Sequence, residues 1–212
     1  MSTRRRLSPE ERRRLLIDAG ERLFAERAYD DVLMEDVAAA AEVSRALLYR
    51  HFPSKRDLFA AVYERAAQQL LVDTPLDSET PFIEQLAAGL DTHFDYFEAN
   101  AHSVVAANRQ LAGDPIIQAI IWGELGELRY RILDRLGMQG KERELGSSVL
   151  MGWLTFVRVV SVDWLDNRSC PRDQLRDICV RALLGALEPI LENADRVSRP
   201  DVSRPSPGDA PP

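Results

Sequence analysis

Residues 41–63 read AEVSRALLYRHFPSKRDLFAAVY, and this stretch decides the fold of the N-terminal part of the chain. Ser44 is a good N-cap for a short helix over 44–51. A second short helix, over 34–41, comes just before it, and only two residues separate the two segments. Two short helices joined by so tight a corner predict a helix-turn-helix, which lays its second helix in the major groove of DNA.

The sequence on either side supplies two further helices. After Pro53, Ser54 and Asp57 form an S-x-x-D box, which predicts a longer helix over 54–72. Upstream, the same kind of box in SPEE opens a first helix over 8–27. These segments predict a three-helix DNA-binding domain over 1–53, joined to the rest of the chain by the helix 54–72.

Apolar residues recur with a helical period through most of the remainder, so we expect an all-α fold of about nine helices. Asn, Gly, Asp and Pro residues mark the breaks between segments. A helical regulatory and dimerisation domain is expected over 54–195, and the Pro- and Ser-rich residues 196–212 are expected to form a disordered tail. The five further helices are expected over 79–99, 101–111, 114–137, 141–167 and 171–193.

Charge is distributed unevenly along the chain. The net charge is −7, yet residues 1–65 carry 13 Lys and Arg against 12 Asp and Glu, and the acidic excess lies beyond them. An acidic body argues against DNA wrapping beyond the N-terminal domain. Two cysteines and the lack of a signal-like start favour the cytoplasm. The apolar stretch 149–165 contains Arg158 and Asp163, so we expect a buried helix and no membrane association.

The second helix of the helix-turn-helix carries the DNA-binding candidates. Arg45 stands on its first turn, where an arginine donates two hydrogen bonds to guanine. Tyr49 and His51 are expected to donate to phosphate oxygens, and Lys55 is expected to act there as a mobile point charge. The exposed amides behind Ser44 favour phosphate as well. The complete predicted set is Ser44, Arg45, Leu47, Tyr49, Arg50, His51 and Lys55.

The quoted run resembles the signature of the TetR family of bacterial repressors, and the resemblance covers roughly residues 8–65. It implies a homodimer with two DNA-binding heads on a palindromic operator, double-stranded DNA as partner, and an all-helical body that holds a small-molecule inducer. Binding of the inducer would release the DNA. The matching residues are Val43, Ser44, Leu48, Tyr49, His51, Phe52, Ser54, Lys55, Asp57 and Leu58.

Several positions depart from the family pattern. Ala28 and Glu42 stand where glycine is usual, so the corner at Glu42 must reach its conformation without the freedom of glycine. Leu33 replaces the Thr or Ser that commonly caps the second helix. Leu47 replaces a frequent threonine, which leaves an apolar side chain for a thymine methyl group. These changes are expected to alter operator preference and not to abolish binding.

The body carries no motif of comparable specificity. Arg158 is the most informative residue, because a guanidinium among apolar residues needs a partner. That partner is an anionic ligand, a carboxylate such as Asp163, or the dimer mate. Aromatic and polar residues on apolar helices are the ligand-binding candidates, although each alone fits an ordinary core. They are His93, Phe97, Asn108, Arg109, Trp122, Trp153, Phe156 and Arg158.

The last two long helices are expected to form the dimer interface, because a two-fold operator requires a dimer. Their apolar stripes supply the surface, and packing within one chain is the alternative. The stripe residues are Leu150, Leu154, Val157, Val160, Ile178, Leu183 and Leu187.

Other classes of function have less support in the sequence. An enzyme would need a nucleophile with its base, a metal site or a phosphate loop, and we find no such motif, so no catalytic residue, metal or cofactor is expected. An architectural or partner-controlled DNA-binding protein without a small ligand shares the N-terminal domain. A body without a cavity would favour that alternative.

Overall fold

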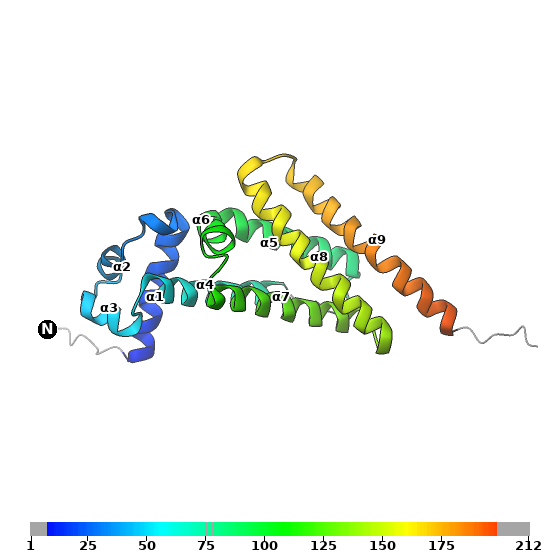
Figure 1. Cartoon of the computed structure of the whole chain (residues 1–212), viewed down its shortest axis with the longest axis horizontal. Coiled ribbons are helices and arrows are strands. Elements are labelled where there is room, and N and C mark those ends of the chain that lie inside the picture. The colour runs from blue at the N-terminus through cyan, green and yellow to red at the C-terminus, as the bar shows by residue number, and fades with distance from the viewer. Residues whose placement is uncertain (1–7, 75, 78, 199–212) are drawn as a thin grey trace, which may run out of the picture.

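The computed structural model describes residues 8–74, 76–77 and 79–198, and within these ranges the chain is all-α, as predicted. Helices α1–α3 form a head at one end, and α4 to α9 form an elongated body (Figure 1). Two short segments, η1 (Tyr29–Asp31) and η2 (Ala106–Gln110), are 3-10 and π-helical. The α-helices of the described residues are α1 (Pro9–Glu26), α2 (Met34–Ala40), α3 (Arg45–His51), α4 (Lys55–Asp73), α5 (Phe82–Ala99), α6 (Ala101–Val105), α7 (Pro115–Arg135), α8 (Gly140–Asn167) and α9 (Arg172–Ser198).

Side-chain caps begin the helices where the sequence predicted them. The Ser8 hydroxyl accepts from the Glu11 amide at 3.1 Å, and the Glu11 carboxylate accepts from the Ser8 amide at 2.6 Å, which completes the capping box. Ser54 accepts from the amide of Asp57 at 3.2 Å. Helix α9 ends later than expected, because 196–198 are helical and not part of the tail. The rest of the predicted tail lies outside the described residues.

Helix α4 belongs to both head and body (Figure 1). Its first half packs on α1, where a Cβ on Gly20 would lie 3.2 Å from Val62, so the two helices approach closely. Phe59 lies edge-on to Phe24, with ring centroids 5.1 Å apart, in the centre of this contact. On the body side the Ser103 hydroxyl of α6 donates to the carbonyl of Phe24 at 3.0 Å. The head is therefore attached to the body by packing as well as by the chain.

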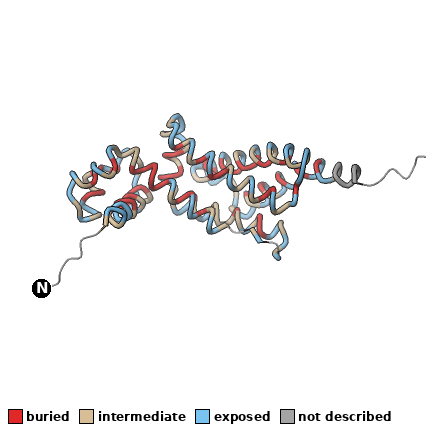
Figure 2. Tube along the Cα trace, turned by 90° about the horizontal axis from the view of Figure 1, so that it is seen from below, coloured by how far each residue is buried: buried red, intermediate tan, exposed pale blue. Residues whose placement is uncertain are grey.

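Helix α8 packs with one face against α7 and α9, and its opposite face is exposed. It is long and apolar enough by composition to cross a membrane, but 44% of its most apolar window is buried against the rest of the chain. Buried positions follow the inner sides of the helices, whereas the outer sides are exposed (Figure 2). The pattern fits the buried helix predicted from the sequence.

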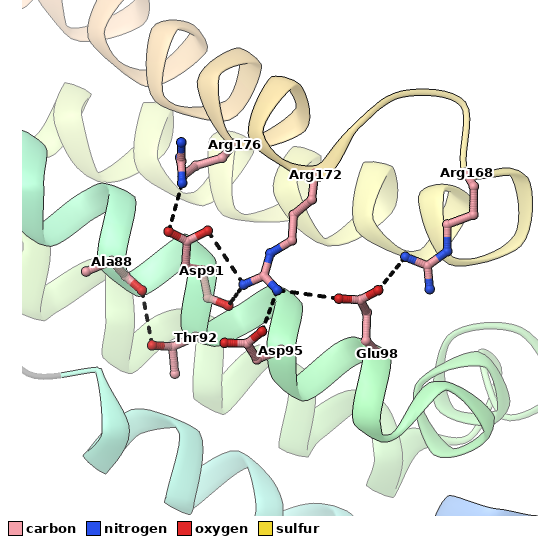
Figure 3. Close-up of polar contacts among 8 residues, drawn as sticks. All are labelled: Ala88, Asp91, Thr92, Asp95, Glu98, Arg168, Arg172 and Arg176. Carbon is pink, nitrogen blue, oxygen red and sulfur yellow. Dashed lines mark hydrogen bonds and ion pairs between the residues drawn. The ribbon is translucent and has the colours of Figure 1, made fainter.

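Ion pairs fasten α5 to the start of α9 (Figure 3). Arg172 pairs with Asp95 and donates to the carbonyl of Asp91 at 2.7 Å, and Arg176 pairs with the Asp91 carboxylate at 3.0 Å. The hydrogen bond from Arg172 lowers the pKa of Asp95 from its ordinary value. Exposed pairs contribute little one by one, but a network with a shared arginine holds a fixed geometry.

Most of the predicted dimer stripe is buried within the chain. Leu150, Leu154 and Val157 of α8 and Leu183 and Leu187 of α9 all lie in the hydrophobic core. The interpretation of these five residues as interface was therefore wrong, because the two helices use those faces to pack inside the body. Ile178 of the predicted stripe is exposed, together with other apolar side chains of α8 and α9: Leu145, Phe156, Val159, Leu184 and Leu191.

The corner between α2 and α3 has a left-handed backbone conformation at Glu42, where the family usually has glycine. Glu42 adopts a positive φ of 53°, in the left-handed region where a side chain strains the backbone. The corner closes through the Val43 amide, which donates to the carbonyl of Ala38 at 2.9 Å. The strain is confined to one residue.

Replacing Glu42 by glycine is expected to raise the free energy of unfolding by about 1 kcal/mol, since glycine adopts this conformation without strain. Ala41→Gly is the control, because Ala41 has an ordinary φ of −86°. That neighbouring change should lower stability by roughly 0.5–1 kcal/mol. Urea unfolding of both variants measures the difference, and a loss of stability in Glu42→Gly would contradict the account.

Candidate nucleic-acid interface and body cavity

Helix α3 is held by one face and leaves the opposite face free. Leu48 is fully buried against the head core, and Phe52 is buried directly after the helix ends. Arg45, Tyr49 and Arg50 are exposed on the remaining surface of the helix. This arrangement is what a groove-reading helix requires, because base edges are reached only by side chains that point away from the protein.

Arg45 is paired in the unbound protein. Its guanidinium lies 3.2 Å from the carboxylate of Glu35 on α2, and the two side chains are 68% and 39% exposed. At such exposure the pair contributes at most about 1 kcal/mol, so DNA can displace it. Arg45 is therefore available to bases only in exchange for Glu35.

The other predicted residues of α3 differ in their availability. Ser44 caps the helix by accepting from the amide of Leu47 at 3.3 Å, as expected. Leu47 is partly exposed, and Leu33 begins α2 without a side-chain cap. The Nε2 atom of His51 is buried and has no hydrogen-bond partner in the described part of the chain. A phosphate contact through this atom requires the imidazole ring to turn.

Lys55 is not the mobile charge that the sequence suggested. Its ammonium donates to the carbonyl of Tyr29 at 2.8 Å and of Asp30 at 3.3 Å, and it lies 4.5 Å from the centre of the Tyr29 ring. These partners are distant in sequence, so no local pattern announced them. Lys55 fastens the start of α4 to the turn between α1 and α2, which makes it a positioning residue for the head.

A cavity of about 70 Å³ lies in the body between α4, α5, α7 and α8. Three of the predicted ligand-binding residues, His93, Trp153 and Arg158, line it. Phe97 and Asn108 lie behind this wall: Phe97 packs on the His93 ring, and Asn108 accepts from Arg158 at 2.8 Å. These five residues come from α5, η2 and α8, and the fold brings them together.

Three other residues predicted for the ligand site do not line this cavity. Trp122 and Phe156 are 50% and 37% exposed on the outer surface of their helices. Arg109 is paired with Asp166 and does not line the cavity. The periodicity of an amphipathic helix gives the spacing of its apolar residues, but large side chains on both faces of α7 and α8 made the inner face ambiguous.

Arg158 is buried, and one of the alternatives considered from the sequence, a carboxylate partner, is present, although the carboxylate is Glu124 and not Asp163. It donates through Nη2 to the hydroxyl of Tyr63 and through Nε to Asn108, while Nη1 lies 3.8 Å from the carboxylate of Glu124. Asp163 is exposed and takes no part. Burial raises the pKa of Glu124, and the positive charge of Arg158 opposes that rise.

Sequence reasoning missed Glu124, Tyr63 and Gln85, which complete the polar part of this site. Glu124 lies in the largely apolar run IIWGELGEL, which also contains Glu127, and a carboxylate among apolar residues was the available signal. Tyr63 and Gln85 carried none, because tyrosine and glutamine are common on partly exposed helices.

Comparison with known proteins bears on the head and on the whole fold separately. Residues 16–62 match the sequence model of the family described as bacterial regulatory proteins, tetR family. The chain is 36% identical over 95 residues to the HTH-type transcriptional activator FasR of Mycolicibacterium smegmatis. That alignment covers 44% of the chain and 43% of FasR, so the chain matches less than half of this relative's length.

Two solved structures illustrate how far the likeness extends. A tetR-family transcriptional regulator from Streptomyces coelicolor is 23% identical and superposes with a TM-score of 0.77, over 92% of this chain and 93% of that one. The multidrug binding protein EbrR, complexed with imidazole, is 18% identical with a TM-score of 0.60, over 81% and 94% of the two chains. At these identities the likeness establishes the fold of the body.

Replacing Glu35 by glutamine is expected to tighten binding to mixed-sequence duplex DNA by about threefold at low salt, because Arg45 is released and one repulsive charge is removed. Glu64→Gln removes an equal charge from α4 and is the control. Fluorescence anisotropy at two salt concentrations measures both. An equal gain in the control would show a general charge effect and not the release of Arg45.

Proposed function

We propose, from the premise that residues 16–62 are a DNA-binding domain of the tetR family, that the chain is a dimeric transcriptional repressor released by a small molecule. It would occupy a palindromic operator in the bacterial cytoplasm. The observation that supports regulation by a ligand is the contact between Arg158 in the cavity wall and Tyr63 on α4, the helix that carries the head.

A continuous series of contacts leads from the cavity to the base of the head. The Tyr63 ring stacks on Phe59 with centroids 5.8 Å apart, and Phe59 meets Tyr29 edge-on at 5.2 Å. Tyr29 in turn holds the ammonium of Lys55 over its ring. A change at Arg158 therefore acts on the packing that sets the orientation of the head.

The size of the cavity supports release on ligand binding. Its present volume of about 70 Å³ accommodates a few water molecules, so a larger ligand must displace the walls. Leu70 and Thr74 of α4 belong to those walls. A ligand that binds the expanded form better shifts α4, and through it the spacing of the two heads in a dimer.

The proposed homodimer forms through α8 and α9, on the exposed apolar side chains named above and not on the predicted stripe. Ile178 is the one residue of that stripe that remains on this list. The exposed set lies on the outer faces of both helices, next to the small residues Gly152 and Gly185. Small residues let helices of two chains approach closely, which favours this surface over the charged faces of the head.

A selection from genomic fragments with the purified protein tests the DNA-binding proposal. We expect an enriched palindrome with half-sites about one helical turn apart. Arg45→Ala should relax preference at one position in each half-site and cost roughly 1–3 kcal/mol there. Retention without sequence preference that vanishes at higher salt would instead indicate an architectural DNA-binding protein.

The dimer surface is tested by Val159→Glu, because Val159 is 62% exposed on α8 and a carboxylate there would be buried at the interface. We expect at least a tenfold weaker dimer by analytical ultracentrifugation. The matched control is Val72→Glu, whose valine is 69% exposed on α4. A dimer unaffected by Val159→Glu would exclude this surface.

A further inference from the structure

The cavity wall contains hydrogen-bond acceptors that have no donor among the described residues. Glu124 is 7% exposed and lines the cavity, yet no hydrogen bond to its carboxylate is found among the described residues. Its one charged neighbour is Arg158, at 3.8 Å, which is beyond hydrogen-bonding distance. A buried carboxylate is thus left with unused acceptor positions.

Gln85 contributes a second unused acceptor. Its Nε2 donates toward three oxygens, the carbonyl and carboxylate of Asp77 and the carbonyl of Thr80, at 2.9, 3.0 and 3.0 Å. Three acceptors around one atom fix the orientation of the amide. Its Oε1 therefore points away from Asp77 and Thr80. This atom is buried and has no hydrogen-bond partner in the described ranges. Gln85 is 7% exposed and lines the same cavity.

His93 supplies a third acceptor, by the following inference about its tautomer. The hydroxyl of Ser161 donates its one hydrogen to the carbonyl of Val157 at 2.6 Å. It can then only accept from the Nε2 of His93, 3.3 Å away, so that atom carries the imidazole proton and Nδ1 does not. Burial, together with the charge of Arg158, lowers the pKa of His93 to about 3, so the ring is neutral.

Most donors of the wall have acceptors within the protein. The Trp153 indole donates to the carbonyl of Cys179 at 2.8 Å, and the Thr74 hydroxyl donates to that of Leu70 at 2.9 Å. Arg158 donates through Nε to Asn108 and through Nη2 to Tyr63, whereas its Nη1 forms no hydrogen bond among the described residues and lies 3.8 Å from the carboxylate of Glu124. The remaining wall is apolar, with Leu, Ile, Val and Phe side chains.

We propose that the cavity binds a small, mostly apolar ligand whose polar end donates hydrogen bonds to Glu124, Gln85 or His93: an alcohol, amine or amide, and not a carboxylate or phosphate. This inference rests on the proposed function only in assigning the cavity as the sensor. A carboxylate ligand would have to compete with Glu124 for Arg158, and it has no hydrogen to donate to the unpaired Oε1 of Gln85.

Calorimetric titration of the full-length protein without DNA tests the proposal with three probes of similar length. 1-Octanol has a donor, 1-methoxyheptane has the same number of heavy atoms and no donor, and octanoate has a negative charge. We expect 1-octanol to bind about tenfold more tightly than 1-methoxyheptane, because the ether leaves the wall acceptors unpaired. Octanoate should bind more weakly than 1-octanol.

Glu124→Gln provides the second measurement, because it keeps the shape of the side chain, supplies an amide donor and removes the negative charge beside Arg158. We expect octanoate to gain about tenfold in affinity and the preference for 1-octanol over 1-methoxyheptane to shrink. The matched control is Glu127→Gln, which removes a carboxylate one turn away that is exposed and paired with Arg131. It should leave the order of the probes unchanged.

The inference is overturned if octanoate binds most tightly, if 1-methoxyheptane equals 1-octanol, or if no probe binds to the wild-type protein. These results are independent of DNA. The same samples are then titrated with a selected operator. A correct probe order without operator binding would overturn the proposed function alone, whereas operator release by octanoate but not by 1-octanol would leave that function standing and refute the ligand class.

Discussion

The hydrogen bond from buried Arg158 to the Tyr63 hydroxyl links the cavity wall of the body to α4, the helix that the head and the body share. Taking a guanidinium out of water costs several kcal/mol unless it is well paired, so its partners cannot be lost cheaply. They come from α4, η2 and α7, and Arg158 itself from α8. One charge therefore fixes the relative positions of four segments, which no apolar contact in the same core does with equal specificity.

The head could be predicted from the sequence because its determinants are local. Caps at Ser8, Ser44 and Ser54 and the corner at Glu42 act within a few residues, and the structure contains each of them. Lys55 is the exception, since its partners lie 25 and 26 residues away. The same distinction applies to the body. The positions of its helices could be predicted, because the periodicity of apolar residues is local. The partners of Arg158 and the inner faces of α7 and α8 could not, because they depend on contacts between residues far apart in sequence.

The cavity wall and the head each contain an arginine that lies beside a carboxylate. In the head, Glu35 forms an exposed ion pair with Arg45 that a stronger acceptor can displace. In the body, the carboxylate of Glu124 lies near Arg158 without a hydrogen bond between them. Unpaired buried acceptors cost free energy in the unliganded protein. A ligand that donates hydrogen bonds to these acceptors removes that cost, and the free energy recovered adds to its affinity. The carboxylates of Glu35 and Glu124 are thus as important for binding as the guanidinium groups beside them.

Because α4 is long, a small tilt about its C-terminal end moves its N-terminal end by a much larger distance. Near its C-terminal end, Arg131 of α7 donates to the carbonyl of Leu71 at 2.6 Å and holds that end in place. The opposite end, at Lys55, lies about 24 Å further along at 1.5 Å per residue. A tilt of about 5° about the fixed end would carry Lys55 through an arc of roughly 2 Å, doubled between two heads in a symmetric dimer. In the proposed dimer, a small displacement of the cavity wall would then be enough to misalign both α3 helices with successive major grooves.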